Sequence, residues 1–209
     1  MRSCALIAVT AAIAALTLSA GCAGLHSNEA VPQIYMLGSA TPPPVAANPV
    51  APGGPVAPTV TVQVLRPLAA PGLDTDQIAL MRDSQRLDYY AASHWPAPLP
   101  DLLQTLAVDA LRSSGRFRAV QPDATAFTAD DVLQIEIRHC QVEYSPDGSP
   151  VVHVQLLATL GARADRALLT SFTAESRKSA SANRMQSVVA AFQGAVSEAL
   201  SQLAAQIAP

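Results

Sequence analysis

The side chains best suited to chemistry in this sequence are three histidines, an internal cysteine and an acidic pair. A metal site from His94, His139 and His153 would need three separate elements to converge, and no paired spacing supports it. Cys140 should lie on the opposite strand face from His139, so we expect a buried thiol without a metal or redox role. The pair Asp130–Asp131 is more typical of a solvated loop than of two catalytic carboxylates. These residues therefore predict no catalytic, metal or cofactor site.

Composition and motifs narrow the functional classes further. The 209 residues carry a net charge of −3 and only 14% charged side chains, which provides no basic stripe for nucleic acid. The glycine-rich phosphate loops, the His-Glu-x-x-His zinc motif and the Gly-x-Ser-x-Gly nucleophile motif do not occur in the sequence. A chain of this length fits one ordinary globular domain with tails.

The amino terminus carries the one motif with a defined chemistry. A basic start at Arg2 precedes an apolar run over 5–18, and Ser19–Cys22 closes it. This pattern predicts a secretory signal peptide over residues 1–21. A retained transmembrane helix is the alternative, but spanning a bilayer takes about 20 apolar residues. The Ser-Ala-Gly-Cys ending resembles a bacterial lipobox, in which the cysteine becomes the lipid-modified first residue.

Cys22 is therefore the predicted lipid attachment site. Two or three acyl chains would hold a domain on a membrane, because each buried CH₂ group contributes about 0.8 kcal/mol. The next residue is Ala23 and not Asp, which by resemblance to Gram-negative lipoproteins favours the outer membrane, with the domain facing the periplasm. With Cys4 removed and Cys22 acylated, Cys140 would be the remaining thiol, so we expect no intramolecular disulfide.

Proline content and periodicity divide the rest of the chain. Residues 22–32 predict a lipidated amino terminus and tether, and residues 33–38 predict a short strand whose alternate side chains face opposite sides. Residues 39–58 contain seven prolines and predict an extended linker. The folded domain is then predicted over residues 59–209.

Hydrophobic periodicity predicts the elements of this domain. Its first half should contain a strand over 59–65, a hairpin of 77–82 and 86–90, a rigid Trp-Pro corner over 93–98, a helix over 100–114 followed by a left-handed Gly115, and a strand over 117–120. Its second half should contain a strand over 130–144, strands over 152–160 and 168–174, a polar turn over 176–181 and a helix over 182–208. The apolar phase of the first of these strands shifts by one residue, which indicates a bulge near His139–Cys140 or a change in which face is covered. His153 alternates with two valines, so we expect it at the surface, away from the core.

These elements predict an α+β fold within the broader α/β class. We expect a two-layer sandwich with a mostly antiparallel, twisted sheet of about six or seven strands and the two main helices on one face. Each helix has apolar residues on one side only, which requires such a second layer.

The order and spacing of these elements resemble those of a known family, the ABC-type transport auxiliary lipoproteins, which includes the paraquat-inducible lipoprotein C. The resemblance covers nearly the whole predicted mature chain. It rests on a Tyr-x-Leu strand, a Val-x-Val strand, Leu-Asp followed by Ile, an Arg in the hairpin, Tyr and Trp before Pro-Leu, and Gly-x-Phe-x-x-Val: Tyr35, Leu37, Val60, Val62, Leu73, Asp74, Ile78, Arg82, Tyr90, Trp95, Pro98, Leu99, Gly115, Phe117 and Val120. The chain departs from the family where His94-Trp95-Pro96 replaces the more usual Arg-Trp-Ala.

The resemblance implies a lipid-anchored accessory subunit, without catalytic activity, of a mammalian-cell-entry (MCE) type ABC transport system. Such a subunit would dock the transporter to the outer membrane for phospholipid trafficking and envelope integrity. An MCE-domain protein is the implied direct partner, and the permease and ATPase would be reached indirectly. The membrane would be contacted through the lipid anchor, nucleic acid is not implied, and a homo-oligomer is compatible with this role.

The aromatic-rich stretch before the predicted helix is the candidate partner surface. It comprises Tyr89, Tyr90, His94, Trp95 and Pro96. Aromatic side chains are enriched at interfaces, but Tyr89 and Trp95 are also explained as core and corner residues.

Two alternatives from other functional classes stay open. A structural or secretion-assembly envelope lipoprotein, unrelated to ABC transport, would form stable rings or pores alone. A periplasmic hydrolase would need a nucleophile with a base nearby, and it would keep its activity after substitution of Cys22.

Overall fold

The computed structural model describes residues 31–38, 58–82, 86–125 and 127–207. Nine strands and two helices, α2 and α3, are formed by these residues. The predicted signal peptide, Cys22, the tether up to residue 30 and residues 39–57 of the predicted linker lie outside them. In the described ranges, no helix is both long enough and apolar enough to span a membrane.

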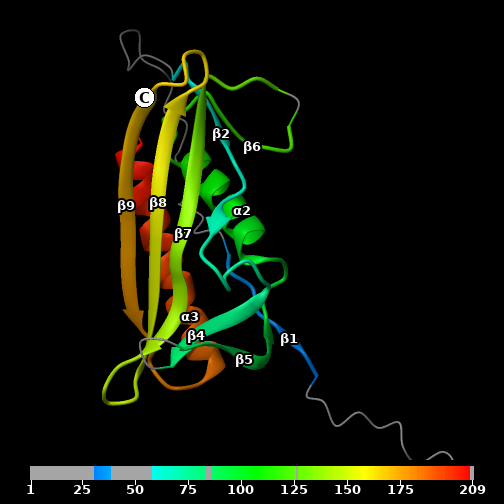
Figure 1. Ribbon diagram of the computed structural model, residues 1–209, viewed down its shortest axis with the longest axis vertical. Helices are drawn as coiled ribbons and strands as arrows, with labels where there is room; N and C mark the ends of the chain where they lie inside the picture. The colour runs from blue at the N-terminus through cyan, green and yellow to red at the C-terminus, as the bar shows by residue number, and fades with distance from the viewer. Residues whose placement is uncertain (1–30, 39–57, 83–85, 126, 208–209) are drawn as a thin grey trace, which may run out of the picture. The chain divides into compact units, whose positions relative to one another are not determined.

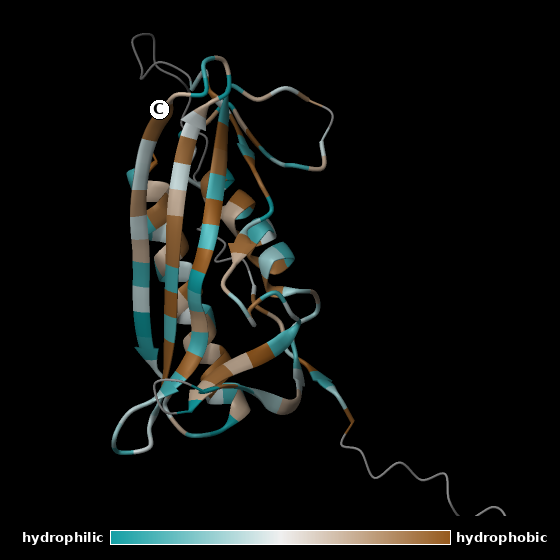
Figure 2. Cartoon of the chain, viewed as in Figure 1, coloured by the Kyte–Doolittle hydropathy of each residue, from teal (hydrophilic) through white to brown (hydrophobic). Residues whose placement is uncertain are grey.

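Three long strands form one half of the sheet (Figure 1). β7 (Asp131–Tyr144), β8 (Pro150–Ala162) and β9 (Leu168–Ser179) run antiparallel in that order. Apolar and polar residues alternate along β7 and β8, as the bands in Figure 2 show, so one face of the ladder is apolar and the other polar. The register of β7 against β8 shifts between Ile137 and His139, which confirms the predicted bulge.

Three short strands pair in succession with the other edge of β7. β2 (Thr61–Val64), β3 (Leu68–Ala69) and β4 (Gln77–Arg82) all run parallel to β7, and their paired segments begin at Asp131, Glu136 and Val142, respectively. The chain over 61–82 therefore follows β7 from one end to the other. A strand of two residues, such as β3, has no periodicity from which it could be predicted.

Three further strands complete the sheet. β6 (Ala119–Pro122) runs parallel to β2, β5 (Arg86–His94) pairs antiparallel with β4, and β1 (Gln33–Ile34) runs parallel to β5. With nine strands and a mixture of parallel and antiparallel pairs, the predicted mostly antiparallel sheet of six or seven strands is only partly correct. The parallel pair of β2 and β6 forms because the β4–β5 hairpin and α2 return the chain to the start of β2.

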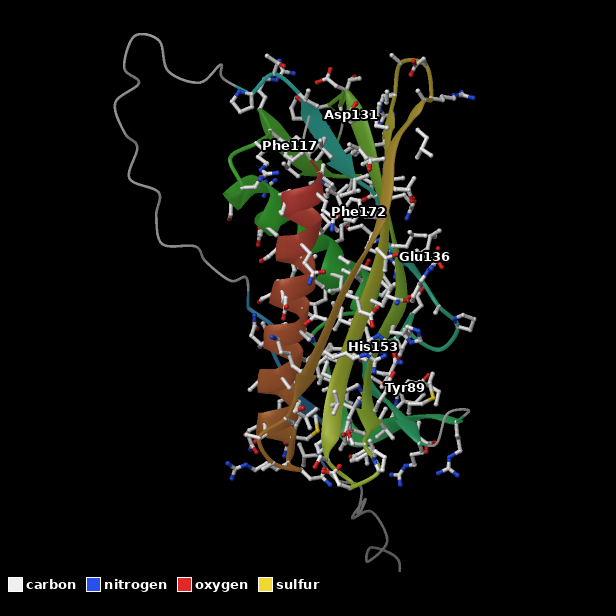
Figure 3. All side chains as sticks on the ribbon, turned by 90° about the vertical axis from the view of Figure 1, so that its left-hand side faces the viewer. Tyr89, Phe117, Asp131, Glu136, His153 and Phe172 are labelled. Atoms are coloured by element: carbon white, nitrogen blue, oxygen red, sulfur yellow. The ribbon has the colours of Figure 1, made fainter. Side chains whose placement is uncertain are left out.

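Both helices lie on the same side of the sheet (Figure 3). α2 (Leu99–Ser113) packs against β2 and β6, and α3 (Met185–Gln206) packs against β8 and β9. Gly115 has a φ of +65°, which confirms the predicted left-handed residue after the first helix. The prediction of a two-layer α/β arrangement with its main helices on one face is thus confirmed.

Two strands are longer than the sequence predicts. β5 continues to His94, so the Trp-Pro corner begins only at Trp95. β9 continues to Ser179, through most of the predicted polar turn over 176–181. Polar residues are compatible with a strand here because the buried Ser176 hydroxyl donates to Glu198 of α3 over 2.9 Å.

Residues 33–38, which we call the strap, are joined to the domain at two points. The Tyr35 backbone N–H donates to the carbonyl oxygen of His94 over 2.8 Å. At the other end, the Gly38 N–H donates to Gln193 Oε1 over 2.7 Å, and the Gly38 carbonyl accepts from Gln193 Nε2 over 2.8 Å. The strap therefore belongs to the compact unit formed by residues 32–209.

Two glycines with positive φ provide a test of the packing at the β4–β5 hairpin. Gly72 (φ +85°) faces the Leu87 side chain, whereas Gly148 (φ +80°) has nothing within 4 Å of an added Cβ. We expect Gly148→Ala to lower the free energy of unfolding by about 1 kcal/mol through backbone strain. Gly72→Ala should cost about 2 kcal/mol or more, because Leu87 must also move. Urea denaturation measures both losses, and equal losses would contradict this packing.

Candidate functional site

Trp95 of the candidate partner surface lies in the core. Its side chain is only 3% exposed, and its ring meets that of Phe192 edge to face, with centroids 5.2 Å apart. Such aromatic pairs contribute about 0.5–1.5 kcal/mol beyond the burial of their area. The burial of Trp95 contradicts a direct contact with a partner and supports the alternative interpretation as a core residue.

Tyr89 and Tyr90 have different partners, as neighbours on a strand do when they face opposite sides. The Tyr89 hydroxyl donates to the Gly72 carbonyl over 2.8 Å, and 36% of this residue is exposed. The Tyr90 hydroxyl lies 3.0 Å from that of Tyr144. Burial raises the pKa of Tyr90, and the hydrogen bond to Tyr144 raises it further, so its hydroxyl stays protonated.

His94 and Pro96 lie on either side of the buried Trp95. His94 is half-buried, with its Nδ1 atom 3.3 Å from Asp76 Oδ2, and Pro96 is exposed. The structure therefore does not bring the five predicted side chains into one patch. Without Trp95, four candidate side chains remain, and of these only Tyr89 and Pro96 are exposed.

A second group of side chains, which the sequence does not predict, lies on the polar face of the sheet, away from α3 (Figure 3). We call it the ionic cluster; it consists of His139 and Glu143 on β7, His153 on β8, and Glu175 and Arg177 on β9. The register places His153 opposite Arg177. The cluster therefore links the three long strands across their polar face.

His153 is at the centre of the ionic cluster. Its Nδ1 lies 2.7 Å from Glu143 Oε1 and its Nε2 lies 3.0 Å from Glu175 Oε1, so an imidazolium would donate to both carboxylates. The Arg177 guanidinium bonds Glu143 Oε2 over 2.9 Å and comes within 3.1 and 3.3 Å of the two ring nitrogens. His139 stacks on the ring at 4.5 Å. His153 is consequently only 3% exposed, and the prediction of a surface histidine is wrong.

The charges of the cluster shift the pKa values of its members. Burial acts to raise the pKa of Glu143, but hydrogen bonds and the charges of His153 and Arg177 outweigh it and lower this pKa. The pKa of Glu175 is lowered first by a hydrogen bond from Gln155 and then by one from Arg177. The pKa of His139 is lowered by burial and by the charge of the adjacent His153. The carboxylates are therefore stabilised in their charged form and His139 in its neutral form.

A metal site is the other chemistry that this group of residues suggests. His139, Glu143 and His153 offer ligand atoms within 4.8 Å of one another. However, imidazole lone pairs lie in the ring plane, and two rings stacked at 15° cannot both point theirs at one ion. Arg177 adds a positive charge that opposes a cation. The geometry thus suits an ionic cross-link between strands, and His94 of the predicted three-histidine set lies elsewhere, against Asp76.

The remaining reactive candidates differ in their burial. Cys140 is buried as expected, and burial raises the pKa of its thiol to about 12, so it stays protonated and unreactive. Asp130 is exposed, and its carboxylate accepts the Thr61 N–H over 2.8 Å. Asp131 is buried at the start of β7, which corrects the expectation that both acids are solvated.

Hairpin pairing is the signal that could have revealed the ionic cluster. Alternation on β8 correctly assigns His153 to the face opposite the core. The turn over 145–149 sets Tyr144 opposite Pro150, and counting back along the pair puts His153 opposite Gln141, between His139 and Glu143 on the same face. The contribution of β9 could not be found in this way, because its polar end resembles a turn.

Comparison with family models identifies the chain. The model of the ABC-type transport auxiliary lipoprotein component matches residues 35–208, which is most of the chain. The chain belongs to this family. The match of this auxiliary lipoprotein to the family model confirms the resemblance seen in its sequence motifs. A search of curated proteins found no significant sequence match.

Solved structures share the fold of this auxiliary lipoprotein. The protein XCC0632 of Xanthomonas campestris is 25% identical, with a TM-score of 0.70, over 82% of this chain and 92% of its own. An uncharacterized protein is 13% identical, with a TM-score of 0.62, over 86% of this chain and all of its own. Both likenesses extend over most of the auxiliary lipoprotein, and the second, at its low identity, shows the fold alone.

The lowered pKa of His139 makes a prediction about stability against pH. The unfolded chain binds a proton at this position near pH 6.5, whereas the folded protein binds it only at lower pH. The free energy of unfolding should therefore fall as the pH drops below about 6.5, and His139→Gln should reduce this slope. Urea denaturation between about pH 7 and about pH 5 measures it.

The exposed neighbour of His139 provides the matched control. Arg138→Gln removes a side chain that does not titrate in this range and should leave the slope unchanged. Protonation of Glu143 and Glu175 also lowers the free energy of unfolding, but only below their ordinary pKa of 4.5, so this loss should be the same in both variants. An unchanged slope in His139→Gln would mean that its burial and the charge of His153 do not act on it.

Proposed function

We propose that the protein is a lipid-anchored, non-catalytic subunit of an MCE-type ABC transport system that docks the transporter to the outer membrane from the periplasmic side. The family match over residues 35–208 is the observation that carries this proposal. A lipobox-like Ser19–Cys22 precedes the matched region and is separated from it by twelve residues. The protein would contribute to phospholipid trafficking and envelope integrity by binding its partners and not by catalysing a reaction.

The described side chains with catalytic potential support a non-catalytic role. A general base needs a free nitrogen or carboxylate oxygen facing the substrate. Both ring nitrogens of His153 instead face Glu143 and Glu175, and the thiol of Cys140 is buried with a raised pKa. These groups serve the fold, which favours an accessory role over the periplasmic hydrolase.

The membrane attachment would come from Cys22. Two or three acyl chains there anchor the protein far more firmly than one would. The strap begins eleven residues after Cys22 and is bound to the domain at His94 and Gln193. The domain would thus be held close to the periplasmic surface of the outer membrane.

The proposed direct partner is an MCE-domain protein, with the permease and ATPase contacted only through it. Four candidate side chains remain for this contact, Tyr89, Tyr90, His94 and Pro96, although Tyr90 faces the other side of β5 from Tyr89. Of these, Tyr89 and Pro96 are exposed, and a half-exposed tyrosine provides both apolar area and a polar end for an interface. The buried Trp95 would support this surface from beneath. A homo-oligomer is compatible with the same arrangement.

Co-purification tests this docking surface. An MCE-domain protein should co-purify with the lipidated protein, and a variant with Tyr89→Glu and Pro96→Glu should retain at least about tenfold less of it, because a lost aromatic anchor costs 2 kcal/mol or more. Leu168→Glu is the control, since Leu168 is also exposed but lies beside the start of β7, whereas β4 and β5 join the sheet at the end of β7. Equal retention by all three proteins, or no binding by the wild type in several detergents, would contradict the proposal.

A further inference from the structure

Two apolar side chains of the strap are exposed in a setting that the fold does not explain. Ile34 is 66% and Met36 is 67% exposed, whereas Leu37, which faces the other way, is only 4% exposed. Alternation along an extended segment accounts for these opposite directions. Ile34 and Met36 are therefore held outward while their neighbour is buried in the core.

The orientation of these two side chains is fixed by the contacts of the strap. β1 pairs with β5 at Ser93 and His94, and Gly38 is bound through both of its backbone polar groups to Gln193. The strap cannot turn over to bury Ile34 and Met36 without giving up these contacts and exposing Leu37. The apolar surface is thus a permanent feature of the folded domain.

The position of the strap in the sequence points to the surface that covers it. Ile34 follows the predicted anchor Cys22 by twelve residues, which span at most about 43 Å when fully extended. Residues 33–38 contain no charged side chain, so approaching a lipid surface would desolvate no charge in this segment. A pair of exposed apolar side chains beside an acyl anchor suits the headgroup region of a membrane.

We infer that Ile34 and Met36 contact the phospholipid interface of the membrane to which Cys22 is attached. This inference rests on the proposed lipid anchor. The contact stays at the level of the headgroups, because β1 is an edge strand of the sheet formed by the described residues, and backbone groups at a sheet edge would be unsatisfied in hydrocarbon. The strap then acts as a second, non-covalent contact that orients the domain.

Leu168, at the end of the sheet far from the strap, provides a reference position for the orientation of the domain. β4, which joins β5 and β1 to the sheet, meets β7 at Val142, whereas Leu168 lies beside Gly161, which pairs with Val132. Ten residues of β7 separate these two levels, or about 33 Å. If the strap lies on the membrane, Leu168 is held away from it on the periplasmic side.

Fluorescence quenching in vesicles tests this orientation. Met36→Cys and Leu168→Cys, labelled with an environment-sensitive dye, place probes at matched exposures of 67% and 65%. Cys140 is buried and Cys22 is acylated, so neither should react. The full lipidated protein is reconstituted in phosphatidylethanolamine–phosphatidylglycerol vesicles that contain lipids with nitroxide quenchers. We expect several-fold stronger quenching at position 36 than at position 168.

Three outcomes would overturn the inference. Equal quenching at both positions would mean that the domain has no preferred orientation. A blue-shifted but unquenched probe at position 36 would mean that protein, either a second copy or a transporter subunit, covers the strap. Failure of the wild type to float with the vesicles would remove the anchor itself, and the inference with it.

Flotation separates the inference from the anchor on which it rests. The wild type should float and Cys22→Ala should not, whatever happens at the strap. A protein that floats but shows no quenching at position 36 would keep its lipid anchor and lose the proposed contact. A variant with Ile34→Ser should still float but show a smaller difference in quenching between the probes at Met36→Cys and Leu168→Cys.

Discussion

The pairing of β7 along both of its edges is the constraint on which the rest of the structure depends. One edge carries β8, and the other carries β2, β3 and β4 in succession. The bulge after Ile137 shifts its alternation, so that Cys140 and Val142 continue the buried face while His139 and Glu143 reach the polar one. Without the bulge, the apolar residues that follow it would face away from the helices.

The ionic cluster follows from the same register. A slip of one residue between β7 and β8 would bring His153 into the apolar layer and a valine into the cluster, which makes the wrong pairing costly. The desolvation of a buried ion pair often offsets its attraction, so the cluster is better understood as fixing register than as adding stability. Only His153 in it is deeply buried; Glu175 and Arg177 keep access to water. The ionic cluster thus links the three long strands across the polar face of the sheet.

The sequence predicts those parts of the fold in which a periodic pattern of side chains continues over many residues. Both helices, Gly115, the bulge and the long hairpin follow from side-chain alternation and turn chemistry, and the order of motifs indicates the family. The short parallel strands could not be predicted, because β3 has only two residues and its pairing depends on β7. The sequence left Trp95 open between core and partner surface and placed His153 wrongly at the surface, because the burial of each depends on residues far away in the chain. These residues are Phe192 for Trp95, and Glu175 and Arg177 for His153.

The function proposed for this domain depends on where its chain is fastened. A strap bound at His94 and Gln193 and a lipid on Cys22 would together hold one end of the sheet at the membrane and present the other surfaces to a transporter. Intact-mass and peptide mass spectrometry of the mature protein tests this most directly. The proposal predicts a chain that begins at Cys22 and carries two or three acyl chains. A mature chain that begins elsewhere, or an unmodified Cys22, would contradict it.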